Sequence, residues 1–180
     1  MHPDTPAFDD VVAAVPLFAP VGEDRRGRVS STTVAPGGGP PVKVVVDFGS
    51  TPEGPDNGPD LEIATRVWEG GDGEDGHGPG ERDIRAFCAE RDLMERRMRD
   101  PLAAQSFALP ADAAWSAHDI AVDGADVAFT VLRTSASWVA AGALPGGALV
   151  RVFTPAPGPG PDALRRITEA AELAPVHGRG

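Results

Sequence analysis

The sequence predicts an α+β fold, an antiparallel sheet of about six or seven strands packed against one long middle helix and a C-terminal helix. Three patterns indicate this fold. Apolar residues alternate on both sides of a turn at Asp123-Gly124, a helical spacing of apolar residues runs from Glu81 to Arg99, and a shorter helical pattern runs from Asp162 to Leu173. Two separate sheets would fit the same strand patterns.

The turn at Asp123-Gly124 predicts the register of one strand pair. In a two-residue hairpin loop, Val122 faces Ala125 and Ile120 faces Val127. One side of this hairpin then carries the apolar residues Ile120, Val122, Ala125, Val127, Phe129 and Val131. A second hairpin is expected across Pro145-Gly146, between residues 137–143 and 148–153. Its expected facing pairs are Val139 with Val152 and Ala141 with Val150.

The N-terminal part of the chain contains further strand patterns. Residues 25–34 and 42–49 are expected to pair as a hairpin with a proline-stiffened loop, and residues 61–68 alternate as a third strand. Residues 7–15 fit a short helix that ends at Pro16, although a strand over residues 11–18 fits nearly as well.

The middle helix is expected over Glu81–Arg99 and ends at Asp100-Pro101, because the residue before a proline avoids helical geometry. Its apolar stripe consists of Ile84, Phe87, Cys88, Met94 and Met98, with Leu93 at the border. Asp162 is the expected cap of the C-terminal helix. The chain is expected to form a single domain, residues 1–180, with mobile loops near residues 35–41, 49–60, 69–80 and 155–161.

The formal net charge is −11, from 27 acidic and 16 basic residues. Phosphate neutralisation supplies most of the affinity of nucleic-acid binders, so this charge argues against a nucleic-acid partner. No apolar run approaches the roughly 20 residues of a membrane span, and the N-terminus lacks the pattern of a secretory signal. These features predict a cytoplasmic protein without a membrane partner.

Three kinds of residue are candidates for chemistry. The acidic loop around Asp72, Glu74 and Asp75 begins like a calcium-binding nonapeptide repeat, but His77 takes the place of an apolar residue and no second copy follows. His118 lies next to Asp119 in a predicted strand and is the histidine best placed to act as a base. The single cysteine, Cys88, lies in the apolar stripe of the middle helix, where a thiol normally serves packing.

Trp68 and Trp138 are candidates for binding, because an exposed tryptophan marks a surface for a partner or ligand, although core packing is the commoner role. No nucleophile elbow, Walker loop or dinucleotide fingerprint occurs in the sequence, and no cofactor is expected.

The segment from Trp115 to Phe153, with Val122-Asp123-Gly124 and Ser137-Trp138-Val139-Ala140, resembles small uncharacterised proteins of actinomycetes. The shared residues are structural, so the resemblance implies no activity. The sequence therefore favours a non-catalytic accessory or protein-interaction module, with a protein partner or a homo-oligomer. The alternative is a small-molecule-binding or enzymatic domain that uses His118 and nearby carboxylates.

Overall fold

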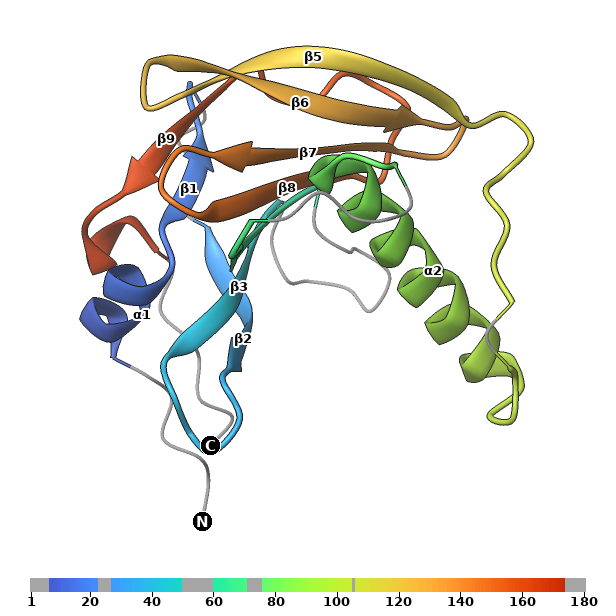
Figure 1. Ribbon diagram of the computed structural model, residues 1–180, viewed down its shortest axis with the longest axis horizontal. Coiled ribbons are helices and arrows are strands. Elements are labelled where there is room, and N and C mark those ends of the chain that lie inside the picture. The colour runs from blue at the N-terminus through green and yellow to red at the C-terminus, as the bar shows by residue number, and fades with distance from the viewer. Residues whose placement is uncertain (1–6, 23–26, 50–59, 71–75, 105, 174–180) are drawn as a thin grey trace.

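The computed structural model describes residues 7–22, 27–49, 60–70, 76–104 and 106–173. Its main feature is a nine-stranded sheet that curls into a half-barrel (Figure 1). The strands are β1 (Leu17–Pro20), β2 (Arg28–Val34), β3 (Pro41–Phe48), β4 (Leu61–Val67), β5 (Ala114–Val122), β6 (Ala125–Arg133), β7 (Trp138–Leu144), β8 (Ala148–Thr154) and β9 (Ala163–Ile167). The helices are α1 (Phe8–Ala14), α2 (Pro79–Arg99) and the short 3-10 helix η1 (Ala170–Glu172).

The strand order is β1-β9-β5-β6-β7-β8-β4-β3-β2. Neighbouring strands run antiparallel except β5 and β9, which run parallel, so the sheet is mixed. The expectation of one antiparallel sheet of six or seven strands, with a C-terminal helix, is therefore wrong. The two-sheet alternative is wrong as well, because all nine described strands belong to one continuous sheet.

The expected helix over Asp162–Leu173 is instead strand β9 followed by η1. Leu164 and Ile167 are spaced three apart and both are buried, which is why the segment resembles a helix in sequence. Its backbone, however, pairs with β1 and β5, where Leu17 faces Ile167 and Val122 faces Leu164. Tertiary pairing thus overrides a short, ambiguous apolar pattern.

The β5–β6 hairpin confirms the predicted register, with Val122 opposite Ala125 and Ile120 opposite Val127. Asp123 and Gly124 both have positive φ values, 50° and 80°, as a type I′ turn requires. The expected face is buried at Ile120, Val122, Phe129 and Val131 and half-buried at Val127, whereas Ala125 is exposed at the turn.

The predicted register of the β7–β8 hairpin is wrong by one residue. Val139 faces Phe153 and Ala141 faces Arg151, because Pro145, Gly146 and Gly147 together form a three-residue loop. Both glycines adopt positive φ, so the loop uses one residue more than Pro145-Gly146 suggests. A slip of one residue moves every side chain to the other face. Arg151 consequently lies on the same face as Val139 and Ala141.

Two apolar clusters cover the two faces of the sheet. The larger cluster defines the face that we call the inner face, and β1 and α1 pack on it. Its largest fully buried side chains include Phe48, Ile63, Ile120 and Phe129. The smaller cluster lies on the outer face, where Ile84 and Phe87 of α2 pack against β6, β7 and β8. The half-barrel is therefore packed on both sides.

Helix α2 confirms the expected middle helix and begins two residues earlier, at Pro79. Only the first half of its apolar stripe is buried. Ile84 and Phe87 contact the sheet, whereas Met94 and Met98 are 63% and 87% exposed. A helix of 21 residues is about 30 Å long, and α2 extends past the sheet into solvent (Figure 1).

The strand predictions in the N-terminal part are confirmed as β2, β3 and β4, and the short helix before Pro16 is confirmed as α1. The connection between β2 and β3 is a closed turn, in which the backbone N–H of Ala35 donates to the carbonyl of Pro40. Residues 50–59 and 71–75, which fall in two of the expected loops, lie outside the described part of the chain.

Candidate functional site

His118 lies on β5 with its side chain about half exposed. Its Nε2 is 3.5 Å from Oδ1 of Asp162, whose side chain is 91% exposed. When His118 is protonated, this pair is a solvated surface ion pair, which contributes little free energy. His118 is not among the lining residues of either of the two cavities that border α1.

The two candidate tryptophans have different environments. Trp138 is buried in the inner cluster, and its ring lies so close to Gly160 that a Cβ there would approach the ring to 2.2 Å. Trp68 is half-buried beside the outer cluster, and its backbone N–H donates to the carbonyl of Gly147. Of these two rings, only Trp68 offers surface to a partner.

Asp72, Glu74 and Asp75 lie outside the described residues. Within the described part of the chain, no three His, Cys, Asp or Glu side chains are grouped to hold a metal ion. Cys88 is half-buried, and burial raises the pKa of its thiol despite the charges of Arg151 and Arg91 nearby. A raised pKa disfavours the thiolate, which is the reactive form.

A group of charged residues, of which two are buried and two are half-buried, joins α2 to the outer face of the sheet. We call it the α2 clamp, and it consists of Glu62 and Arg66 of β4, Asp83 of α2 and Arg151 of β8. Asp83 accepts a hydrogen bond from Arg66 Nε at 2.8 Å and another from Arg151 at 3.2 Å. Arg151 also donates to Glu62 at 3.2 Å.

The clamp is packed under aromatic rings. The guanidinium of Arg151 lies 3.9 Å from the centre of the Phe87 ring, and Phe87 meets Phe153 edge to face at 5.2 Å. The guanidinium of Arg91 lies 4.5 Å from the centre of the Phe153 ring and 5.6 Å from that of Phe87. Because both clamp arginines are paired with carboxylates, the clamp has no unpaired positive charge for an anionic substrate. Its ion pairs join α2 to β4 and β8.

Asp47 lies beside the clamp on β3, directly opposite Glu62. The pKa of the Asp47 carboxyl is raised above its ordinary value, and burial is the largest cause. A hydrogen bond with Ser30 lowers the pKa, the charge of Glu62 raises it, and the charge of Arg28 has the smallest effect and lowers it. A carboxyl group with a raised pKa next to a second carboxylate is a pattern found at catalytic sites. Of the described residues that shift the pKa of Asp47, Ser30 carries the one hydroxyl and none is a histidine.

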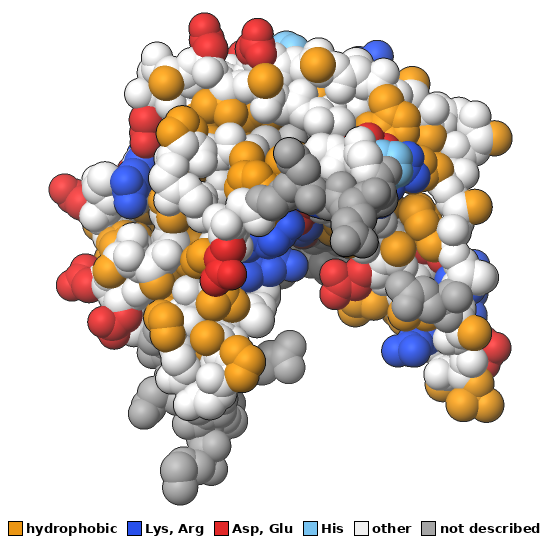
Figure 2. All heavy atoms as spheres, in the orientation of Figure 1, with side chains coloured by type: hydrophobic (Ala, Val, Ile, Leu, Met, Phe, Trp, Pro, Cys, Tyr) orange, Lys and Arg blue, Asp and Glu red, His pale blue; other side chains and the backbone are white. Residues whose placement is uncertain are grey.

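The exposed end of α2 forms a projection that we call the distal arm, residues 90–104. Its apolar surface consists of Met94, Met98 and Leu102, and Leu102 is 91% exposed. Arg96 holds the arm in shape. Its guanidinium donates to Asp92 and to the backbone carbonyls of Ala104 and Ser106, and so ties the returning chain to the helix. Figure 2 shows the molecule hollowed between this arm and the β2–β3 hairpin.

A second surface feature lies beside α1. We call it the α1 groove, a cavity of about 1490 Å³ between α1, strand β2 and the first residues of β3. Its apolar lining includes Phe8, Val11, Val29, Val34, Val67 and Leu173. Val34 and Val67 are 42% and 40% exposed.

Sequence reasoning missed the α2 clamp, the distal arm and the α1 groove. One signal for the clamp was present, because Arg151 interrupts an apolar strand and Asp83 interrupts the apolar side of α2. The other two depend on where the sheet ends, which has no local signal.

Comparison of the chain with protein-family models, curated proteins and solved structures gives no match. None of the described helices has the length and apolar character needed to cross a membrane.

Proposed function

We propose that the protein is a non-catalytic, cytoplasmic interaction module that contacts a partner protein through the distal arm. The observation that carries this proposal is the exposure of Met94, Met98 and Leu102 at the end of α2. Large apolar side chains grouped on a projection are typical of a contact surface. Methionine adapts its shape to a partner's pocket, which suits it to such a surface.

The arm is preorganised for binding. The hydrogen bonds of Arg96 hold the chain after Pro101 against α2. A preorganised surface loses less conformational entropy when it binds. Met94 and Met98 are spaced four apart, so they fit an apolar groove of the partner as a helix side.

The net charge of −11 narrows the class of partner. This charge disfavours the binding of nucleic acid. It also disfavours the association of two copies of the chain, because two molecules of the same charge repel each other. A different protein with an apolar groove is therefore the favoured partner. The alternative, an enzymatic or ligand-binding domain that uses His118 and nearby carboxylates, has only the exposed His118–Asp162 contact in its support.

The proposal is tested by capturing partners from the native host with the wild-type chain and with the double variant Met94→Glu, Met98→Glu. Val21→Glu is the matched control, because Val21 is an apolar residue of comparable exposure outside the arm. We expect one protein to be captured by the wild type and the control and lost with the double variant. The purified partner should then bind the double variant at least about tenfold more weakly in calorimetry.

Equal capture by all three chains would contradict the proposal. A folded double variant is expected, because neither methionine contacts the core, and circular dichroism checks this point. If light scattering instead shows that the wild type is a dimer and the double variant is a monomer, the arm binds a second copy of the chain. A different protein as the partner of the arm is then excluded.

A further inference from the structure

Strand β2 is an edge of the sheet, and its backbone is available for pairing. In the described chain, β2 pairs with β3 on one side, and on its other side only the single bridge from Gly27 to Leu173 lies near its start. An unpaired strand edge is a template for another strand. The usual protections are few here, because residues 29–34 contain neither a charge nor a proline. Two irregularities in the pairing with β3 bend the strand, and Ser31–Thr33 pairs regularly between them.

The α1 groove runs along this same edge. The four consecutive residues 29–32 all line it, together with Val34, although alternate residues of a strand point to opposite faces. The groove therefore reaches the edge of β2 itself and does not lie over one face alone. Helix α1 forms its opposite wall through Phe8 and Val11.

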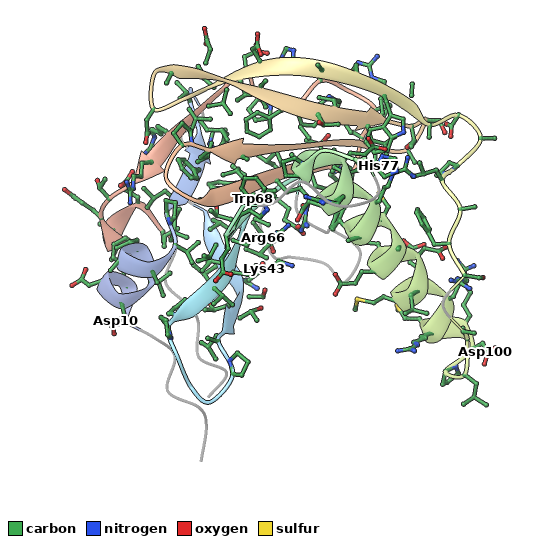
Figure 3. The ribbon with its side chains drawn as sticks, viewed as in Figure 1. Asp10, Lys43, Arg66, Trp68, His77 and Asp100 are labelled. Carbon is green, nitrogen blue, oxygen red and sulfur yellow. The ribbon has the colours of Figure 1, made fainter. Side chains whose placement is uncertain are left out.

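The charges around the groove define the chemistry of its occupant. Its charged lining residues are Asp10 and Glu69, and no Lys, Arg or His is among its described lining residues. Asp10 is exposed on α1, where Figure 3 labels it. Carboxylates at an apolar groove select basic side chains beside apolar ones, and the net charge of −11 attracts the same kind of chain.

We propose that the α1 groove binds an extended, apolar peptide segment with basic side chains, from a partner protein, which pairs with the free edge of β2. Main-chain hydrogen bonds to β2 would provide affinity. Alternate side chains of the peptide would enter the groove towards Val34, and its basic side chains would meet Asp10 on the α1 wall. This mode of recognition adds a strand to the sheet. It is independent of the distal arm, which lies on α2.

The test uses the full chain and a fluorescein-labelled peptide in which valine alternates with lysine, as long as the seven residues of β2. Two control peptides accompany it. In one, glutamate replaces each lysine, and in the other, alternate backbone nitrogens are methylated. Fluorescence anisotropy should show saturable binding of the lysine peptide, with a dissociation constant on the order of 100 μM or tighter. Binding of each control peptide should be at least about tenfold weaker.

Matched protein variants locate the binding surface. Asp10→Lys should weaken binding of the lysine peptide about fivefold or more, because it reverses a charge at the groove. Asp9→Lys makes the same change on the neighbouring residue, which does not line the groove, and should bind as the wild type does. The arm variant Met94→Glu, Met98→Glu should also bind the peptide as the wild type does. Failure of the arm proposal can therefore be distinguished from failure of the groove proposal.

Four results would overturn the proposal. One is the absence of saturable binding, and another is equal affinity for the methylated peptide, which would exclude pairing with β2. The third is an equal effect of Asp9→Lys and Asp10→Lys on peptide affinity. This result would show that the net charge of the protein, and not the groove, attracts the peptide. If the wild type is a dimer that Val34→Asp dissociates, a second copy occupies the edge and the peptide proposal is wrong.

Discussion

Among the described residues, two buried polar side-chain atoms lack a hydrogen-bond partner, Asp47 Oδ1 and Arg151 Nε. Both belong to the charged patch on the outer face. The positive charge of Arg151 is compensated by ion pairs with Asp83 and Glu62. The carboxylate of Asp47 instead lies opposite another carboxylate, that of Glu62. A buried charge with imperfect compensation lowers the stability of the fold. Asp47 is therefore the residue at which neutralisation should stabilise the molecule.

We predict that Asp47→Asn raises the free energy of unfolding near neutral pH. Burial raises the pKa of Asp47 above the ordinary value of 3.8, so the folded chain favours its protonated form. The contribution of this group to stability is full below 3.8 and is lost as the pH rises through the folded-state pKa. The gain from Asp47→Asn should thus shrink as the pH falls towards 3.8.

Urea unfolding at a series of pH values measures this gain. Asp126→Asn is the control, because Asp126 is an exposed carboxylate on β6. A loss of stability in Asp47→Asn, or a gain that does not depend on pH, would show that the carboxylate of Asp47 is compensated in the folded chain.

At the scale of elements, the position of α2 depends on one close approach as well as on the clamp. A Cβ at Gly80 would lie 2.3 Å from the carbonyl oxygen of Ala141 on β7. The first turn of α2 therefore lies directly on the backbone of the sheet, and Asp83 follows within clamp distance of Arg66 and Arg151. The distal arm projects in its observed direction because this end of the helix is fixed.

We predict that Gly80→Ala lowers the free energy of unfolding by about 2 kcal/mol, because the methyl group forces α2 away from β7. Gly78→Ala is the matched control, since it lies two residues earlier and a Cβ there meets nothing within 4 Å. Its effect should stay within about 0.5 kcal/mol. Urea unfolding measures both variants, and an equal effect of the two would contradict the close packing of α2 on β7.

The elements also show what the sequence can predict. The β5–β6 hairpin was predictable because both turn residues, Asp123 and Gly124, have a local signature. The β7–β8 register depends on whether the loop uses one glycine or two, and the wrong choice places Arg151 on the wrong face. The strand β9 depends on pairing with β1, which lies more than a hundred residues away in the chain.

The candidate sites were less predictable for the same reason. The α2 clamp joins residues of two strands and a helix, and the α1 groove joins the start of the chain to β2 and to Leu173. Local periodicity can indicate that Met94 and Met98 share a helix side. It cannot indicate that the sheet ends before that side is covered.

At the scale of the whole molecule, the two ends of the described chain meet in the sheet. Strand β1 pairs with β9, and Gly27 bridges to Leu173, so the curled sheet is held by contacts of very long sequence separation. Closing such contacts is entropically unfavourable. The compact state also gathers an excess of acidic residues, which gives it a formal charge of −11. Self-repulsion of this size opposes compaction.

We predict that NaCl stabilises the protein, with the melting temperature rising by roughly 2–4 °C between low salt and about 0.3 M NaCl. Salt screens the repulsion between exposed carboxylates, whereas the buried clamp pairs of Arg151 are screened much less. Circular dichroism melts in NaCl and in sodium sulfate of equal ionic strength test this explanation. Screening alone gives the same shift in both salts, and a larger shift in sulfate would indicate strengthened apolar burial instead. A melting temperature that falls with NaCl would mean that exposed ion pairs such as Arg85–Glu81 and Arg96–Asp92 outweigh the net charge.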